Sequence, residues 1–145
     1  MNVTDLTQRP PRSPRVKLGG YVLLPRMLDK GRATIAGKAG EYHYGCPLDQ
    51  RFLQFTGLDK ESILDLLKTG KSDSEVLAWI REKAPKPDWE IVAWSRWMID
   101  RAPSDADGHR YVAETAEKAA SMRDDIATYF DMLDLDDYVS FGGQG

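Results

Sequence analysis

Helix-starting and helix-ending residues divide this chain into short segments, and they constrain its fold more than any other feature. Pro47 stands where the first residue of a helix favours proline, and Gly57 stands where that helix would end. Ser72 and Glu75 have the spacing of a capping box, in which each side chain binds a backbone N–H at the start of a helix. Between such signals the apolar residues recur at helical spacing. The sequence therefore predicts a series of short helices.

The expected helices account for most of the chain. They cover residues 24–36, 47–56, 60–69, 73–83, 88–101 and a periodic stretch over 105–133. A second capping pattern at Ser121–Asp124 divides that last stretch into two helices, and residues 134–145 form an acidic, aromatic tail. Strands could form only at Tyr21–Leu24 and Tyr42–Tyr44. We therefore expect an all-α fold, a single compact helical domain of about six to seven helices.

The length and cysteine content indicate a soluble intracellular protein. A chain of 145 residues suits one domain. No apolar run approaches the roughly 18 residues that a membrane-spanning helix needs. The polar first residues lack the apolar region of a secretory signal. Cys46 is the single cysteine, so no internal disulfide can form, and we expect a cytoplasmic location and no membrane partner.

Residues 1–17 differ in composition from the rest of the chain. Three of them are prolines, which remove backbone donors and favour extended conformations. Arg9, Arg12 and Arg15 recur at every third residue, and this spacing places them on one side of a polyproline II segment. We expect an extended basic arm packed on the body, which is a helical domain over residues 18–145 with an acidic C-terminal segment.

Positive and negative charges are separated along the sequence. Residues 1–40 carry eight Lys or Arg and two Asp, a balance of +6, whereas residues 41–145 have a balance of −9. This separation fits an anion site near the N-terminus, association between chains such as a homodimer, or docking of the basic segment on the chain's own acidic end. The overall pI of about 5.4 and the lack of an RNA-binding or zinc-finger signature argue against a nucleic-acid partner.

An anion site is the most specific of these possibilities. Arg26 and Lys30 lie four residues apart on the first expected helix, so their side chains project from one face. If the arm crosses that face, Arg12 or Arg15 would add a second guanidinium, and paired guanidinium groups bind phosphate or carboxylate well. We therefore predict anion binding by these four residues.

Cys46 is the candidate for reactive chemistry. It precedes the expected first turn of a helix, where the helix dipole favours a thiolate, and His43 lies three residues before it as a candidate base. The alternative is a small buried side chain with a structural role. His43, Cys46 and Asp49 also have part of the spacing of a metal site, but the other histidine, His109, is distant in sequence, so we predict neither a metal nor a cofactor.

The four tryptophans could form a ligand cage or part of the core. Trp94 and Trp97 lie three residues apart on one expected helix, and Trp79 lies next to Ile80 on the helix before it. This pattern is typical of core packing, which we favour for these three. Trp89 follows two prolines at a helix start, and we expect it to be exposed.

Several stretches, most of them in the first 60 residues, are typical of one protein family. They are Asp5–Thr7, Pro11–Arg15, Leu18–Tyr21, Leu24–Lys30, Gly40–Tyr44, Cys46–Asp49, Leu133–Asp134, Asp136–Tyr138 and Gly142–Gly143. On these motifs the chain resembles, over nearly its full length, the bacterial proteins grouped as domain of unknown function 5069. The resemblance implies a small stand-alone bacterial protein and brings no activity, cofactor or catalytic residue with it.

Two functions of different classes follow from these observations. The first is a non-catalytic interaction or small-anion-binding module, because no complete catalytic constellation is visible. The second is an enzyme that acts on an anionic small molecule, with Cys46 and His43 as reactive groups and Arg12, Arg15 and Arg26 holding the substrate. The sequence identifies no partner for either function.

Overall fold

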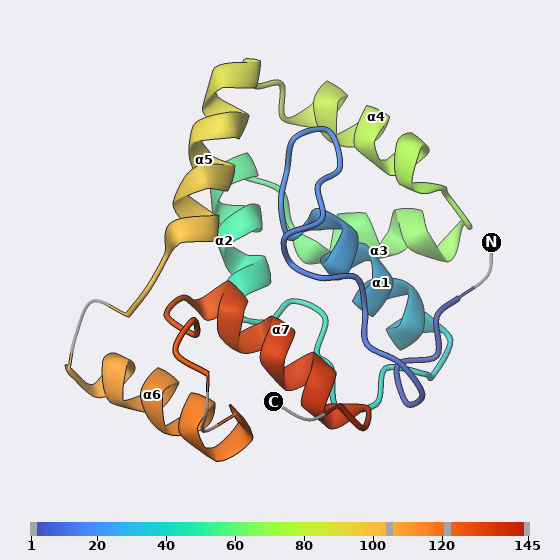
Figure 1. The fold of residues 1–145 in the computed structure, drawn as a ribbon. Helices are drawn as coiled ribbons and strands as arrows, with labels where there is room; N and C mark the ends of the chain where they lie inside the picture. Colours follow the sequence, from blue (N-terminus) through green and yellow to red (C-terminus); the bar gives the residue numbers. More distant parts are fainter. Residues whose placement is uncertain (1–2, 104–105, 121–122, 144–145) are drawn as a thin grey trace.

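The computed structural model describes residues 3–103, 106–120 and 123–143. In these residues the chain forms seven helices and no sheet, which confirms the all-α prediction (Figure 1). Strand-like pairing within them is limited to one isolated bridge between Leu18 and Tyr21. The helices are α1 (Leu24–Ile35), α2 (Pro47–Thr56), α3 (Lys60–Lys68), α4 (Asp73–Lys83), α5 (Asp88–Asp100), α6 (Ala106–Ala120) and α7 (Tyr129–Ser140).

The first five helices begin and end close to the predicted residues. Pro47 is the first residue of α2, and Gly57 ends that helix with a φ of 75°, in the left-handed region that favours glycine. The Ser72–Glu75 capping box is present at the start of α4. Asp59 caps α3 by accepting a hydrogen bond from the backbone N–H of Ser62. Local signals therefore set these boundaries.

The C-terminal part differs from the prediction. Residues 129–140 form α7, whereas we expected a helix ending near residue 133 and then a tail. The physical reason is a capping box at the start of α7 between Thr128 and Asp131. Leu135 and Asp137 are buried beyond the expected end, so tertiary contacts hold the helix there. The predicted division at Ser121–Asp124 falls partly outside the described residues.

Helix α1 lies at the centre of the molecule. Figure 1 shows α3 and α4 on one side of it, α2 and α5 on the other, and α7 next to its N-terminal half. Nine residues of α1 are buried, including the charged Arg26, Lys30 and Arg32. A Cβ at Gly31 would lie 2.6 Å from Leu67 Cδ1, so glycine allows α3 to approach α1 closely. The central helix thus carries three buried cations.

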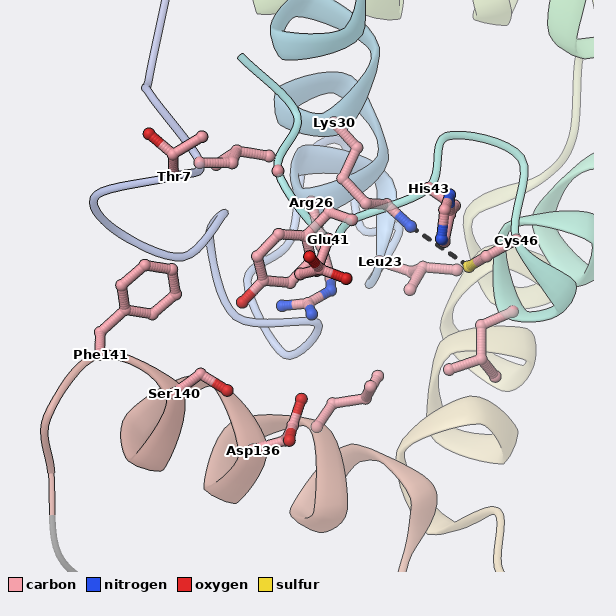
Figure 2. A pocket seen from close by; sticks show the side chains of 15 residues that line it. Thr7, Leu23, Arg26, Lys30, Glu41, His43, Cys46, Asp136, Ser140 and Phe141 are labelled. Carbon is pink, nitrogen blue, oxygen red and sulfur yellow. Dashed lines mark hydrogen bonds between the residues drawn. The ribbon is translucent and has the colours of Figure 1, made fainter.

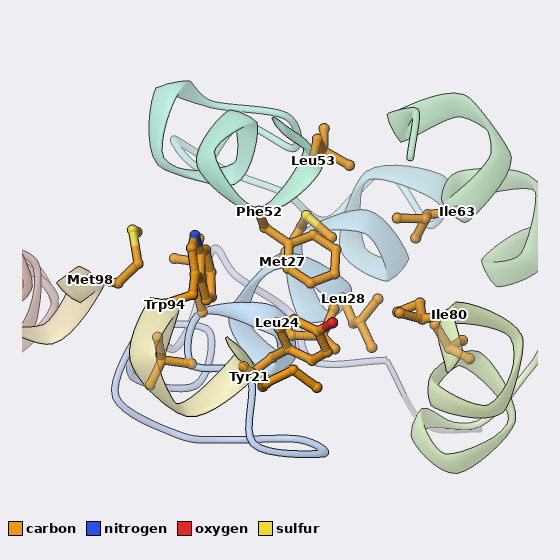
Figure 3. Close-up of a cluster of buried hydrophobic side chains, with 14 of the residues drawn as sticks. Tyr21, Leu24, Met27, Leu28, Phe52, Leu53, Ile63, Ile80, Trp94 and Met98 are labelled. Carbon is orange, nitrogen blue, oxygen red and sulfur yellow. The ribbon is translucent and has the colours of Figure 1, made fainter. Parts of the chain in front are cut away.

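The hydrophobic core surrounds one aromatic group. Tyr21, Phe52 and Trp94 pack edge to face with ring centroids 5.2 to 6.1 Å apart (Figure 3). The core prediction is correct for Trp94, which is 8% exposed, and wrong for Trp97, which is 48% exposed. Arg51 and Arg101 lie within cation–π distance of the Trp97 ring, so two cations cover part of it. Trp89 is exposed as expected.

The N-terminal segment makes backbone contacts with residues further along the chain. The N–H of Leu6 donates to the carbonyl of Lys38 at 2.9 Å. The carbonyl of Pro14 accepts from the N–H of Leu23 at 2.8 Å. These contacts place the segment beside α1. No helix in the described residues has the length and apolar composition needed to cross a membrane.

Candidate functional site

One cavity of about 510 Å³ lies between α1, α7 and the segment from Gly40 to Leu48 (Figure 2). Residues of the N-terminal segment complete its wall. Polar side chains from all three elements converge on it, as Figure 2 shows. Its apolar side chains are Leu6, Leu23, Leu48, Leu133 and Phe141.

Four of the six candidate residues line this cavity. Arg26 and Lys30 reach it from consecutive turns of α1, and His43 and Cys46 reach it from the Gly40–Leu48 segment. The sequence predicts an anion site for the two cations and a reactive site for the other two residues. In the structure both pairs share one cavity. The other two candidates, both in the N-terminal segment, lie elsewhere.

Unusual backbone conformations shape the cavity wall. Leu23 immediately precedes α1 with a φ of 71°, although it is buried and is not glycine. Such a conformation costs roughly 1–3 kcal/mol and persists only where surrounding contacts hold it. Gly45, with a φ of 82°, makes the turn before Cys46 and α2. A Cβ at Gly45 would meet Lys60 Cδ at 2.8 Å, so both the turn and the available space favour glycine.

Lys30 connects Cys46 to a buried carboxylate. Its Nζ lies 3.2 Å from the Sγ of Cys46 and 2.9 Å from Oδ2 of Asp49. The Lys30 side chain is 4% exposed and that of Asp49 is fully buried. Oδ2 of Asp49 also accepts from the N–H of Gly45 at 2.9 Å. Oδ1 of Asp49 is buried without a hydrogen-bond partner in the described part of the chain.

Arg26 forms a second buried ion pair beside the cavity. It donates from Nη1 and Nη2 to the two oxygens of Asp137 on α7, at 2.7 and 3.2 Å. Burial acts to lower the pKa of Arg26, but the hydrogen bonds and charge of Asp137 outweigh burial and raise it. Tyr42 donates its hydroxyl to Asp137 at 2.7 Å, and its ring lies 5.5 Å from the guanidinium carbon of Arg26. Burial and the bond to Asp137 raise the pKa of Tyr42 above its ordinary value.

Arg12 lies in a different polar cluster. It pairs with Asp29 at 2.9 Å and with Asp73 at 2.8 Å, and Arg32 pairs with Asp73 at 2.7 Å. These four residues line a second cavity of about 450 Å³. Burial acts to raise the pKa of Asp73, but the two arginines outweigh it and lower that pKa. Arg12 therefore already binds two carboxylates of its own chain.

Arg15 pairs with the acidic end of the chain. Its guanidinium contacts Asp131 and lies 3.0 Å from Asp134, both on α7. The hydroxyl of Ser13 also donates to Asp134, at 2.7 Å. The two donor side chains on this surface come from the segment before α1, and α7 supplies both acceptors. The separated charges of the sequence meet here.

Two further carboxylates lie on the wall of the first cavity. Glu41 and Asp136 both line it and both are exposed. Neither has an ion-pair or hydrogen-bond partner among residues 3–103, 106–120 and 123–143. Since Arg26 and Lys30 each have a carboxylate partner, Glu41 and Asp136 leave the wall with a negative balance.

The structure assigns Asp49 to Lys30, so the partial metal spacing noted in the sequence has another explanation. In the described parts of the chain, no group of three or more His, Cys, Asp or Glu is placed to hold a metal ion. His43 lines the cavity beside Cys46, but no hydrogen bond joins the two side chains in the described residues.

Sequence patterns did not indicate the ion pairs made by the two buried carboxylates of the site, Asp49 and Asp137. Asp49 carried a signal, because an acidic residue in the first turn of a helix is favoured there, but nothing local indicates that it binds Lys30. Asp137 lay in the expected tail, and its burial depends on α7 packing beside α1. Contacts between residues far apart in sequence leave no periodic pattern.

Comparison with known proteins gives a family assignment. A search of curated proteins found no significant match. One family model matches residues 8–139, a range that includes all seven helices except the last residue of α7. The range also includes every charged residue described above as lining the cavity or pairing with a lining residue. The chain therefore belongs to the family described as domain of unknown function DUF5069.

Proposed function

We propose that the protein is a small-molecule-binding module and that its ligand occupies the cavity between α1, α7 and the Gly40–Leu48 segment. One observation carries the proposal: four of the residues singled out from the sequence line this one cavity together with apolar side chains. A volume of about 510 Å³ is within the range of small-molecule sites, which are mostly apolar with a few convergent polar groups.

The charges on the wall favour a neutral or positively charged ligand with an apolar body. Arg26 and Lys30 are each paired with a buried carboxylate. Glu41 and Asp136 add two negative charges without a partner in the described residues. An anion would have to displace Asp137 or Asp49 from its cation, and breaking a buried ion pair is costly. The anion site expected from the sequence stays a prediction, and an anionic probe tests it.

Three matched probes test the proposal: benzylamine, benzyl alcohol and benzoate share one ring and differ in charge. Binding is measured by titration of isotope-labelled protein and followed through backbone amide shifts. We expect benzylamine and benzyl alcohol to bind more tightly than benzoate and to shift the amides of Leu48, Cys46 and Ser140. Tightest binding by benzoate would support the anion site instead, and no binding by any of the three would contradict the proposal.

A pair of variants on α7 locates the binding site. Ser140 lines the cavity, whereas the exposed Tyr138 on the same helix does not. Ser140→Trp places an indole at the cavity and should weaken binding. Tyr138→Trp adds the same group outside it and should leave binding unchanged. Equal loss in the two variants would show that the probes bind elsewhere.

A further inference from the structure

The geometry points to Cys46 as a nucleophile, with Lys30 as its acid–base partner, and to a neutral activated acyl compound such as an ester as the substrate class. This inference rests on the proposed function, because the acyl compound must enter the same cavity. It adds a reaction to binding. It also replaces the histidine that the sequence indicated with a lysine.

The contact between Lys30 and Cys46 carries the argument. Nζ of Lys30 lies 3.2 Å from Sγ, the contact that the dashed line in Figure 2 marks. Both residues line the cavity. Cys46 is half-buried, so its sulfur is sheltered while a ligand in the cavity can still reach it. An ammonium group beside a sulfur stabilises the thiolate, which is the nucleophilic form.

Asp49 positions the lysine. Its Oδ2 lies 2.9 Å from Nζ, and the carboxylate is fully buried in the first turn of α2, the helix that Cys46 precedes. The ammonium group is therefore fixed between a carboxylate and a sulfur. A nucleophile, an acid–base group and a third group that orients it are the three parts of a nucleophilic site. Oδ1 of Asp49, buried without a partner in the described residues, leaves an acceptor next to this cluster.

The start of α2 supplies donors for the charge that develops on an acyl oxygen. Cys46 is the residue immediately before this ten-residue helix, and Pro47 has no N–H. The N–H groups of Leu48 and Asp49 follow in the first turn, where a helix provides no internal acceptor for them. Leu48 lines the same cavity as the sulfur. Backbone donors of this kind stabilise the oxyanion of an acyl-transfer intermediate.

The reaction then runs in two balanced steps. The thiolate of Cys46 attacks the acyl carbon, a C–S bond forms, the bond to the leaving alcohol breaks, and that alcohol takes a proton from Lys30 Nζ. Water next attacks the thioester carbon and gives a proton to the neutral Lys30 amine, and the C–S bond breaks to restore the thiolate. The sum is ester plus water giving carboxylic acid plus alcohol, with both residues returned to their starting state.

The test uses 4-nitrophenyl acetate, a small neutral ester that releases 4-nitrophenol, whose anion is coloured. We expect the full chain to release nitrophenol at pH 7 at least about tenfold faster than glutathione does at equal thiol concentration. Mass spectrometry should find one acetyl group on Cys46, which is the single cysteine of the chain. Cys46→Ser should abolish the reaction while still binding benzyl alcohol, which separates this inference from the proposed function. A rate no faster than that of glutathione would overturn the inference.

Substitutions of the neighbouring residues test the role of Lys30. Lys30→Met alone leaves Asp49 buried without a cation and could unfold the protein, so the informative variant is Lys30→Met with Asp49→Leu, checked for folding by circular dichroism. We expect it to react about 100-fold more slowly than the wild type. Lys68→Met with Asp65→Leu removes an exposed Lys–Asp pair of α3 outside the cavity, and this matched control should stay within about twofold of the wild type. An unchanged rate in the Lys30 and Asp49 double variant, or an equal loss in the control, would overturn the assignment to Lys30.

Discussion

Arg26 of α1 and Asp137 of α7 form a buried, two-pronged ion pair across 111 residues of sequence, with N–O distances of 2.7 and 3.2 Å. The pair joins the central helix to the last helix at the edge of the cavity. Tyr42, from the segment between α1 and α2, binds the same carboxylate. Three parts of the chain therefore meet at Asp137, and its removal should affect the whole fold.

Asp137→Ala should lower the free energy of unfolding by about 3–5 kcal/mol, because it leaves the Arg26 charge buried without a partner. Asp136→Ala, at the neighbouring exposed position, should change it by less than about 0.5 kcal/mol. Urea denaturation of both variants at one pH measures the difference. Replacing both members of the pair, as Arg26→Met with Asp137→Leu, should recover much of the loss. Equal stability of the two single variants would show that the pair contributes little.

Trp94→Ala should destabilise the protein by about 3–5 kcal/mol, because the indole packs in the aromatic core against Tyr21 and Phe52. Trp89 lies on the same helix but is 69% exposed, so Trp89→Ala should cost less than about 0.5 kcal/mol. Denaturation midpoints at unchanged slope provide the comparison. If Trp94→Ala kept its stability, the assignment of this residue to the core would be wrong.

The pKa of Tyr42 gives a prediction at high pH. Burial and the bond to Asp137 raise this pKa above the ordinary value of 10.0. In the unfolded chain the hydroxyl ionises near pH 10, so the stabilising contribution is complete below that pH and is lost as the pH rises above it. The free energy of unfolding should therefore fall as the pH rises above about 10. Tyr42→Phe should show a smaller fall, although not a flat profile, because the pKa of Tyr44 is also raised by burial. An identical fall in both proteins would contradict this role of Tyr42.

Much of the fold could be predicted because its boundaries are set locally. The proline and glycine around α2 and the capping box of α4 act through neighbouring residues, so the sequence shows them directly. The full length of α7 could not be predicted in this way. Its second half, residues 135–140, carries two adjacent carboxylates, and only burial against α1 and pairing with Arg26 explain why it is helical.

The candidate site was predictable in its members more than in its arrangement. The four-residue spacing of Arg26 and Lys30 correctly placed them on one face of α1. Helix signals also placed Cys46 immediately before α2. The partner of its sulfur is a lysine 16 residues earlier, and such a contact depends on how α1 and α2 pack. Sequence proximity suggested His43, the nearest basic group along the chain, whereas the hydrogen bond to the sulfur comes from Lys30.

The most direct measurement of the central claim, that the cavity binds small molecules, is the position of a bromine atom in crystals soaked with 4-bromobenzylamine. The anomalous signal of bromine marks the bound probe without relying on a binding curve. The account predicts the strongest peak inside the cavity, among Leu48, Leu133 and Phe141, with the amine directed toward Glu41 or Asp136. The same peak should disappear in Ser140→Trp and persist in Tyr138→Trp. A strongest peak outside the cavity, or one that Ser140→Trp leaves in place, would contradict the account.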